Sequence, residues 1–242
     1  MSASIVTLIV QGTLALLVFS SALAWAIVIV KGIQLARFSR EDQRFRAAFP
    51  ARTSLPRREE VAAARGPVAR LALVGLDAWG TDHARDELDV HKDVLERSLS
   101  QQIRNERRTL DTGLTLLASI GTTAPFVGLF GTVFGIIDAL GSIAASGSAS
   151  LDVVAGPIGE ALIATGVGIA VAVPAVLAYN YFGRRVKSIV ADLDDYASSL
   201  VNTALRSTLS ARSTPKRASA PIEEDALPVA THGALVGQEA RT

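Results

Sequence analysis

The sequence contains no cysteine, so disulfide bonds and thiolate metal sites are excluded. It also lacks charge over two long stretches. No Asp, Glu, Lys or Arg occurs in residues 1–30, and no Lys or Arg occurs between Arg108 and Arg184. The net charge of the 242 residues is only +1, which gives no basis for binding nucleic acid. Charge segregated in this way is typical of an integral membrane protein with one sizeable aqueous segment.

Motifs that carry catalysis are also missing. The sequence has no phosphate-binding Gly-Lys motif and no nucleophile paired with a base, and its three histidines are scattered in charged or tail sequence. We therefore expect neither an enzyme nor a cofactor or metal site.

Three apolar runs are long enough to cross a bilayer, which takes about 20 residues. They cover about Ile5–Val30, Thr112–Ala145 and Val153–Phe182. The first run is too long for the core of a signal peptide and has no basic residue ahead of it, so we expect a retained helix. A short linker rich in Ser and Gly joins the second and third runs, which predicts an antiparallel hairpin.

Basic residues predict the orientation of these spans, because cytoplasmic flanks are enriched in Lys and Arg. They follow the first span, precede the second and follow the third: Lys31, Arg37, Arg40, Arg44, Arg46, Arg104, Arg107, Arg108, Arg184, Arg185 and Lys187. The N-terminus and the hairpin tip carry none. The pattern predicts that both of these lie outside the cytoplasm and that the C-terminus lies inside it.

The expected fold class is all-α, with helices that extend from the membrane into the cytoplasm. The expected segments are a first transmembrane helix (1–31), a cytoplasmic helical domain (32–111), the hairpin (112–182), a cytoplasmic C-terminal helix (183–209) and a disordered tail (210–242). An amphipathic helix without Gly or Pro is predicted from Asp82 to Arg108, running straight into the second span. A further helix from Arg57 to Leu76 is expected to be interrupted at Gly66–Pro67.

The second and third spans contain several small residues and prolines. The glycines of the second span are Gly121, Gly128, Gly131 and Gly135, and the prolines of the two spans are Pro125, Pro157 and Pro174. Glycine lets helix backbones approach closely in lipid, so we expect this face to pack within the chain and between copies. Each proline predicts a bend whose freed carbonyl is satisfied nearby.

Polar side chains at membrane depth are the candidate functional residues, since charge there is costly and is usually kept for transport or partner contact. They are Thr132 and Asp138 in the second span, and Glu160 and Thr165 in the third. Counting outward from the hairpin midpoint places the two threonines opposite each other and the two carboxylates nearly so. Asp138 is the weaker candidate, because it can reach the outer interface.

Three blocks of sequence resemble the MotA/TolQ/ExbB proton channel family. They are Ala118–Ile136, Val154–Thr165 and Val173–Asn180. The resemblance is close over roughly residues 110–200 and is greatest to the ExbB-type members, with TolQ-type members sharing almost all of the same motif residues. Two positions depart from the family pattern: Phe134 stands where Trp is common, and Gly156-Pro157 inverts the usual order.

The resemblance implies a subunit of the bacterial inner membrane that forms a homo-oligomeric ring, typically a pentamer, in contact with lipid. Such a ring surrounds the transmembrane helices of an ExbD-like single-span protein, whose Asp carries the proton. The assembly energises a TonB-like protein for uptake across the outer membrane. Thr132, Glu160 and Thr165 match the family's polar pore positions, whereas Asp138 does not match an essential one.

Two alternatives remain open from the sequence. One is a TolQ-type subunit that drives envelope constriction. The other, from a different class, is a passive membrane scaffold in which the glycine faces form an oligomer and the carboxylates only bind a partner. A MotA-type stator fits less well, because such proteins have four spans and three are predicted here.

Overall fold

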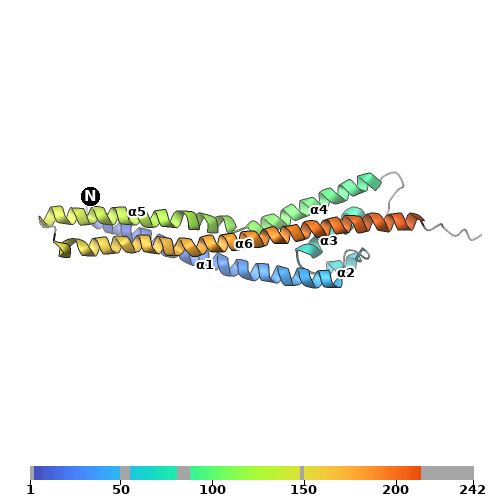
Figure 1. Ribbon diagram of the computed structural model, residues 1–242, viewed down its shortest axis with the longest axis horizontal. Coiled ribbons are helices and arrows are strands. Elements are labelled where there is room, and N and C mark those ends of the chain that lie inside the picture. Colours follow the sequence, from blue (N-terminus) through green and yellow to red (C-terminus); the bar gives the residue numbers. More distant parts are fainter. Residues whose placement is uncertain (1–2, 50–54, 81–87, 148–149, 214–242) are drawn as a thin grey trace, which may run out of the picture.

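The computed structural model describes residues 3–49, 55–80, 88–147 and 150–213, and these form an elongated helical molecule (Figure 1). The elements in chain order are α1 (Ala3–Ala48), α2 (Arg58–Ala62), α3 (Pro67–Trp79), α4 (Leu88–Asp111), α5 (Leu114–Ser146) and α6 (Leu151–Ser213). The described part of the chain contains no strand, which confirms the all-α fold class.

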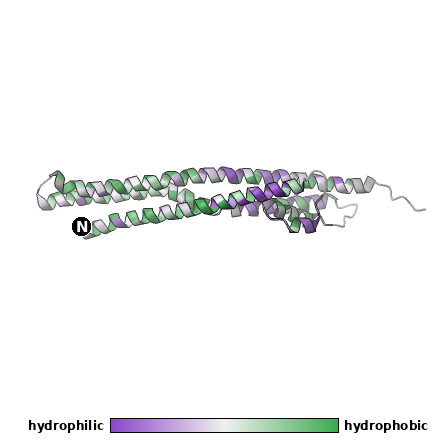
Figure 2. Cartoon of the chain, turned by 90° about the horizontal axis from the view of Figure 1, so that it is seen from below, coloured by the Kyte–Doolittle hydropathy of each residue, from purple (hydrophilic) through white to green (hydrophobic). Residues whose placement is uncertain are grey.

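Two regions follow one another along the long axis. At one end α5 and α6 form an antiparallel pair, and α1 packs along both of them (Figure 1). At the other end α3 packs against α4 and α6, and the short α2 packs against α3. Apolar residues predominate at the hairpin end and charged residues at the other (Figure 2). We call the end with α2, α3, α4 and the C-terminal part of α6 the charged half. This division is the one that the charge segregation of the sequence predicts.

Three helical stretches are long and apolar enough to cross a membrane. They are Ile5–Ala48, Leu88–Ser146 and Val153–Leu209, and each contains an 18-residue apolar window. Only 17%, 28% and 33% of these windows are buried within the chain. Most of the apolar surface of the spans is therefore available to lipid or to other protein chains. By length and composition, the prediction of three spans is confirmed.

The junction between α4 and α5 corrects one expectation. The amphipathic helix does not run straight into the second span, because α4 ends at Asp111 and α5 begins at Leu114. Gly113 between them has φ = 83°, a left-handed conformation that favours glycine. The predicted part of this helix within residues 81–87 lies outside the described residues.

Lys31 of α1 explains how the chain tolerates this break. Its Nζ donates hydrogen bonds to the carbonyls of Leu110 at 3.0 Å and Thr109 at 3.4 Å, and to Gln34 Oε1 at 2.8 Å. The last carbonyls of a helix have no partner within it, and a cation there is favoured by the helix dipole. Lys31 therefore caps the end of α4 from another helix, and it is only 5% exposed.

The third span and the C-terminal helix are one continuous element, α6. It passes through Pro157 and Pro174 and runs on to Ser213. The rest of the expected disordered tail, 214–242, lies outside the described residues. The interruption predicted at Gly66–Pro67 is confirmed, because α2 ends at Ala62, α3 begins at Pro67, and Gly66 between them has φ = 112°.

Candidate functional site

Glycines allow the backbones of α5 and α6 to touch. A Cβ built on Gly128 would lie 2.7 Å from the Ala164 carbonyl oxygen, and one on Gly168 would lie 2.6 Å from the Ala124 carbonyl oxygen. Further out, a Cβ on Gly135 would lie 2.5 Å from Ala161 Cβ. Each distance is shorter than ordinary van der Waals contact, so no larger residue fits at these positions without movement of the backbone.

Gly131 brings α1 to the same level. A Cβ on Gly131 would lie 2.9 Å from both Ala164 Cβ of α6 and Thr13 Oγ1 of α1. Thr13 is itself buried and donates a hydrogen bond to the carbonyl of Val10 at 2.7 Å. From the sequence we expected the glycine face to pack both within the chain and between copies. The structure shows the contacts within the chain. This packing fixes the positions of α5 and α6 around the next residue, Thr132.

Thr132 and Thr165 face each other across the hairpin. Thr165 Oγ1 donates a hydrogen bond to Thr132 Oγ1 at 3.4 Å, and Thr132 Oγ1 donates to the carbonyl of Leu129 at 2.7 Å. The predicted register of the hairpin is confirmed, because it paired these two residues. The bond between the hydroxyls is longer than the usual 2.5–3.0 Å of an O–H···O bond, so it is weak and easily exchanged.

The direction of these bonds determines what the pair offers to a third group. The proton of Thr132 is donated to the backbone and the proton of Thr165 is donated to Thr132. The Thr165 oxygen therefore keeps lone pairs that can accept a hydrogen bond. Thr132 is buried, whereas Thr165 is half-buried, so Thr165 is the member of the pair that another chain can reach.

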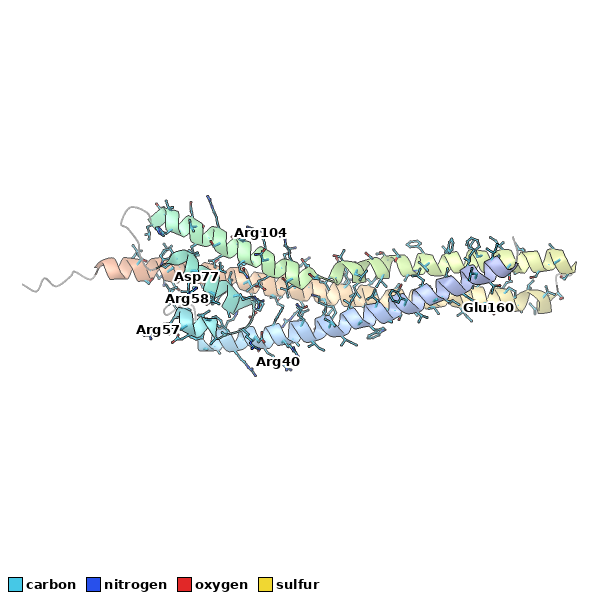
Figure 3. All side chains as sticks on the ribbon, turned by 180° about the vertical axis from the view of Figure 1, so that it is seen from behind. Arg40, Arg57, Arg58, Asp77, Arg104 and Glu160 are labelled. Atoms are coloured by element: carbon cyan, nitrogen blue, oxygen red, sulfur yellow. The ribbon has the colours of Figure 1, made fainter. Side chains whose placement is uncertain are left out.

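Glu160 lies away from the threonine pair. It is five residues before Thr165, which is about 140° around an ideal helix, and it is exposed in the single chain. Figure 3 places it at the apolar end of the molecule, far from the labelled cations Arg40 and Arg104. The described residues give its carboxylate no ion pair or hydrogen bond. A carboxylate at this depth therefore calls for water or a polar group from another chain.

Asp138 is half-buried on α5, and its carboxylate has no ion pair or hydrogen bond with the described residues. The predicted near-opposition to Glu160 is not tested by the described hydrogen bonds and ion pairs, because two carboxylates form neither with each other. In an ideal helix Asp138 is about 120° around α5 from Thr132, so the two side chains leave α5 on different faces. Of the four polar positions singled out in the sequence, the two threonines are the ones joined by a hydrogen bond in the described part of the chain.

Comparison with known proteins identifies the family of this chain. The profile of the MotA/TolQ/ExbB proton channel family matches residues 64–195. The chain is 40% identical over 195 residues to "Biopolymer transport protein ExbB" of Neisseria gonorrhoeae, covering 78% of this chain and 89% of the relative. The chain belongs to the MotA/TolQ/ExbB proton channel family.

Other relatives carry the same name. The protein named "Biopolymer transport protein ExbB" of Xanthomonas campestris pv. campestris is 38% identical over 195 residues, covering 76% of this chain and 77% of the relative. That of Salmonella typhimurium is 32% identical over 194 residues, with the same coverage of both chains. Together with the three apolar helices, these relatives indicate a bacterial membrane protein with a transport function.

Two charged residues, Lys31 and Glu106, have structural roles that the sequence did not reveal. Lys31 was counted only as a basic flank of the first span, but it caps α4. Glu106 lies in the amphipathic helix that the sequence predicts from Asp82 to Arg108, and it is only 4% exposed. Arg70 of α3 binds both of its carboxylate oxygens at 2.7 Å, and Gln102 donates to one of them at 2.7 Å. This bidentate pair joins α3 to α4.

Proposed function

We propose that this chain is the ring subunit of an ExbB-type motor of the bacterial inner membrane, driven by the proton-motive force. In this proposal the ring, a pentamer, surrounds the transmembrane helices of an ExbD-like single-span partner. The assembly then energises a TonB-like protein for uptake across the outer membrane. The observation that carries the proposal is the paired Thr132 and Thr165 at membrane depth in a chain whose relatives are named ExbB.

The threonine pair suits a partner carboxyl group that alternates between two protonation states. When the carboxyl is protonated, its O–H can donate to the free lone pairs of Thr165. When it is ionised, Thr165 can turn its own O–H towards it and give up the weak 3.4 Å bond to Thr132. Thr132 keeps its bond to the Leu129 carbonyl in both states, so it holds the level of the pair while Thr165 changes partner.

The exposed surface of the spans supports the ring. Large apolar side chains on all three spans remain open in the single chain, among them Phe19, Trp25, Phe126, Phe130 and Leu177. Glu160 lies on the exposed face of α6 and has a charge that lipid does not accommodate. We place Glu160 at the contact with the partner or with the neighbouring subunit, where water or polar groups can meet it.

Removing single polar groups tests this function. Thr132→Val and Thr165→Val keep the side-chain shape and remove the hydroxyl, so each variant should assemble with the partner yet lose uptake of a large siderophore. Glu160→Ala should also abolish uptake while the ring still forms, and Asp138→Asn should have a far milder effect. Assembly is checked in parallel by native mass spectrometry of the purified complex.

The alternatives predict different results. Normal uptake in both threonine variants would make the hydroxyls structural, and normal uptake in the Glu160→Ala variant as well would favour a passive scaffold. A TolQ-type subunit would leave siderophore uptake unchanged and would instead impair envelope constriction in the same variants.

The proposed orientation has a separate test. The basic flanks place the hairpin tip in the periplasm and the segment around α4 in the cytoplasm. Alkaline phosphatase, which is active only outside the cytoplasm, should be active when fused near Ser148 and inactive when fused near Asp89. The reverse pattern would refute the three-span topology in this orientation.

A further inference from the structure

A cavity lies between α1 and α6, at the level where both helices pass from apolar to charged sequence. It has a volume of about 470 Å³. Two of its lining side chains, Leu35 of α1 and Phe182 of α6, are apolar and buried. The other lining residues are Gly32, Ala36, Ser39 and Arg40 of α1, and Tyr181 and Arg185 of α6. The cavity thus combines apolar side chains with hydroxyl and guanidinium groups.

Two arginines line this cavity from different helices. Arg185 Nη2 donates a hydrogen bond to Ser39 Oγ at 3.0 Å, so the guanidinium of α6 is held beside α1. Arg40 is the next residue along α1 and lines the same cavity. Neither guanidinium has an ion pair with a carboxylate of the described residues. Two such cations at one cavity suit an anion, and arginine can bind a phosphate with two hydrogen bonds at once.

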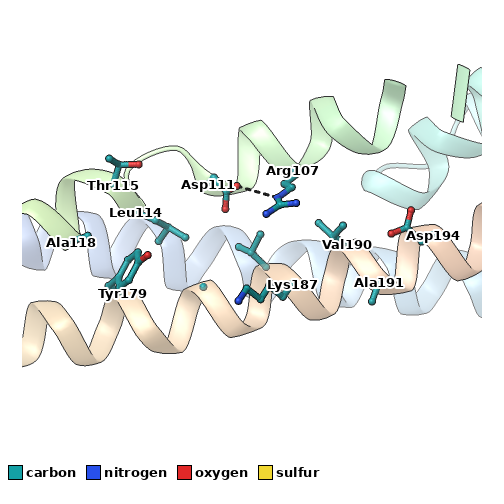
Figure 4. Close-up of a pocket in the computed structure, with 12 residues that line it drawn as sticks. Arg107, Asp111, Leu114, Thr115, Ala118, Tyr179, Lys187, Val190, Ala191 and Asp194 are labelled. Carbon is teal, nitrogen blue, oxygen red and sulfur yellow. Dashed lines mark ion pairs between the residues drawn. The ribbon is translucent and has the colours of Figure 1, made fainter. Parts of the chain in front are cut away.

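A larger cavity, of about 650 Å³, has a different charge. It lies between α4, α5 and α6, and the carboxylates of Asp111 and Asp194 line it (Figure 4). Arg107 in its wall is already paired with Asp111, at 3.5 Å. An anion in this larger cavity would meet two carboxylates, whereas none of the residues described as lining the cavity between α1 and α6 is acidic. The smaller cavity is therefore the better anion site.

Exposed apolar side chains continue from the smaller cavity towards the apolar end of the molecule. On α1, Ile29 and Trp25 lie about one and two turns before Gly32, and each is more than half exposed. On α6, Leu177 lies about one turn before Tyr181, and both are exposed. Tyrosine is enriched where lipid tails meet the head groups. An anion site beside an exposed apolar surface matches the chemistry of a phospholipid.

We propose that the cavity between α1 and α6 binds an anionic phospholipid, with its phosphate at Arg40 and Arg185 and its acyl chains along the apolar surface beside them. Charge complementarity favours this occupant, because one molecule supplies both the negative charge and the apolar length. Basic pockets at the cytoplasmic ends of membrane helices bind such head groups. The inference goes beyond the proposed motor function, and only the choice of the cytoplasmic leaflet rests on the proposed orientation.

Native mass spectrometry of the purified protein in a non-ionic detergent tests this site. Phosphatidylglycerol, which has a net negative charge, is titrated in parallel with phosphatidylcholine, which has a phosphate but no net charge. The chain should bind phosphatidylglycerol more tightly, at up to one molecule per subunit. The double variant Arg40→Gln/Arg185→Gln should weaken this binding about tenfold or more, because each cation near an anionic lipid contributes about fivefold.

Arg37→Gln/Arg184→Gln is the matched control. Both arginines are exposed on the same two helices at nearly the same level, but neither is among the residues that line the cavity. The control removes the same charge and should bind phosphatidylglycerol nearly as well as the unmodified chain. Equal losses in the two double variants would reflect net charge alone and would overturn the site.

A second measurement covers the case in which the cavity variant fails to fold. Because the chain has no cysteine, Ala36→Cys introduces a single thiol into the wall of the cavity. In nanodiscs, phosphatidylglycerol should slow its reaction with an uncharged, water-soluble maleimide several-fold relative to phosphatidylcholine. Gln43→Cys, at an exposed position about two turns further along α1, should react at the same rate in both lipids. An equal rate for Ala36→Cys in both lipids would show that the proposal is wrong.

Other occupants of the cavity would give other results. Glycerophosphoglycerol, the head group without acyl chains, should not compete at equal concentration, and competition would assign the cavity to a free phosphate instead. If Arg40→Gln/Arg185→Gln keeps its lipid but the mass of its assembly falls, the cavity is a contact between copies and the lipid site is refuted. Lipid binding is measured without uptake, so failure of the proposed function would leave these results unchanged, and failure of the lipid site would leave the proposed function standing.

Discussion

The two halves of α6 are held in place by different means. In the hairpin, small residues bring the backbone of α6 against α5, as at Gly128 and Ala164. In the charged half, large side chains such as Leu193 and Leu200 of α6 are fully buried together with Leu99 of α4. In lipid no hydrophobic effect drives apolar helices together, so their association depends on close contact between backbones. In water the burial of leucine side chains is enough to hold helices together.

The same contrast appears at single glycines. Gly75 of α3, in the charged half, has as its near neighbours the side-chain ends of Leu200 and Leu99. Gly128, in the hairpin, has as its near neighbours the backbone atoms of Ala164 and Thr165. A leucine side chain can turn to make room for a methyl group, but the backbone of a packed helix cannot. The two halves should therefore tolerate the same substitution very differently.

Gly128→Ala should have the largest effect. Its new Cβ would meet the Ala164 carbonyl oxygen, so the hairpin must separate at the threonine level, at a cost above the about 1–3 kcal/mol typical of overpacking side chains. We expect loss of the folded protein, measured as its yield and as the mass of the assembly it forms after extraction in detergent. Gly75→Ala is the matched control, and its gain in helix propensity of about 1 kcal/mol offsets the movement of two leucines. Equal losses in both variants would remove the distinction between the halves.

Glu106→Ala should have the next largest effect, confined to the charged half. It removes the partner of the Arg70 guanidinium, and hydrogen bonds to charged groups contribute about 1.5–3 kcal/mol. Hydrogen exchange of the α3 and α4 amides should speed up accordingly, while that of the hairpin stays unchanged. Glu96→Ala removes an exposed pair with Lys92 and should change exchange by about 0.5 kcal/mol or less. Faster exchange in the hairpin would show that the halves are coupled.

Asp42→Asn should have the smallest effect, and one that depends on pH. Asp42 lies in the charged part of α1, beyond the apolar run, and accepts a hydrogen bond from the Val68 N–H at the start of α3. Burial raises the pKa of its carboxyl from 3.8 to about 6, with help from Glu106, although the Val68 hydrogen bond, Arg46 and Arg70 oppose the rise. A raised pKa in the folded state means that stability is greatest below about pH 4 and is lost as the pH rises through about 6.

The test of Asp42 is therefore a difference between two proteins at two pH values. Asparagine still accepts the Val68 hydrogen bond but does not titrate. Between about pH 5 and about pH 7 the thermal midpoint of the natural chain in detergent should fall relative to that of Asp42→Asn. A constant difference between the two proteins across this range would contradict the raised pKa.

Much of the hairpin could be predicted from the sequence, because its constraints are local. Apolar length defines the spans, and the turn-rich linker determines which residues of α5 and α6 lie opposite each other. The pairing of Thr132 with Thr165 follows by counting from the tip, and the 3.4 Å bond between their hydroxyls confirms it. Counting could not give the surroundings of Asp138 and Glu160, because the faces they occupy depend on helix rotation and on other chains.

The sequence by itself determined the helical class, the three apolar spans, the hairpin register and the family, because periodicity, length and short motifs carry that information. Only the tertiary structure decided where α4 ends, because that depends on Lys31, a residue 79 positions away from the Leu110 carbonyl that it binds. The burial of Glu106 was likewise decided by Arg70 on a different helix. The energy of a capped carbonyl or a buried carboxylate depends on which groups the fold brings beside it, and helical patterns in the chain do not record those neighbours.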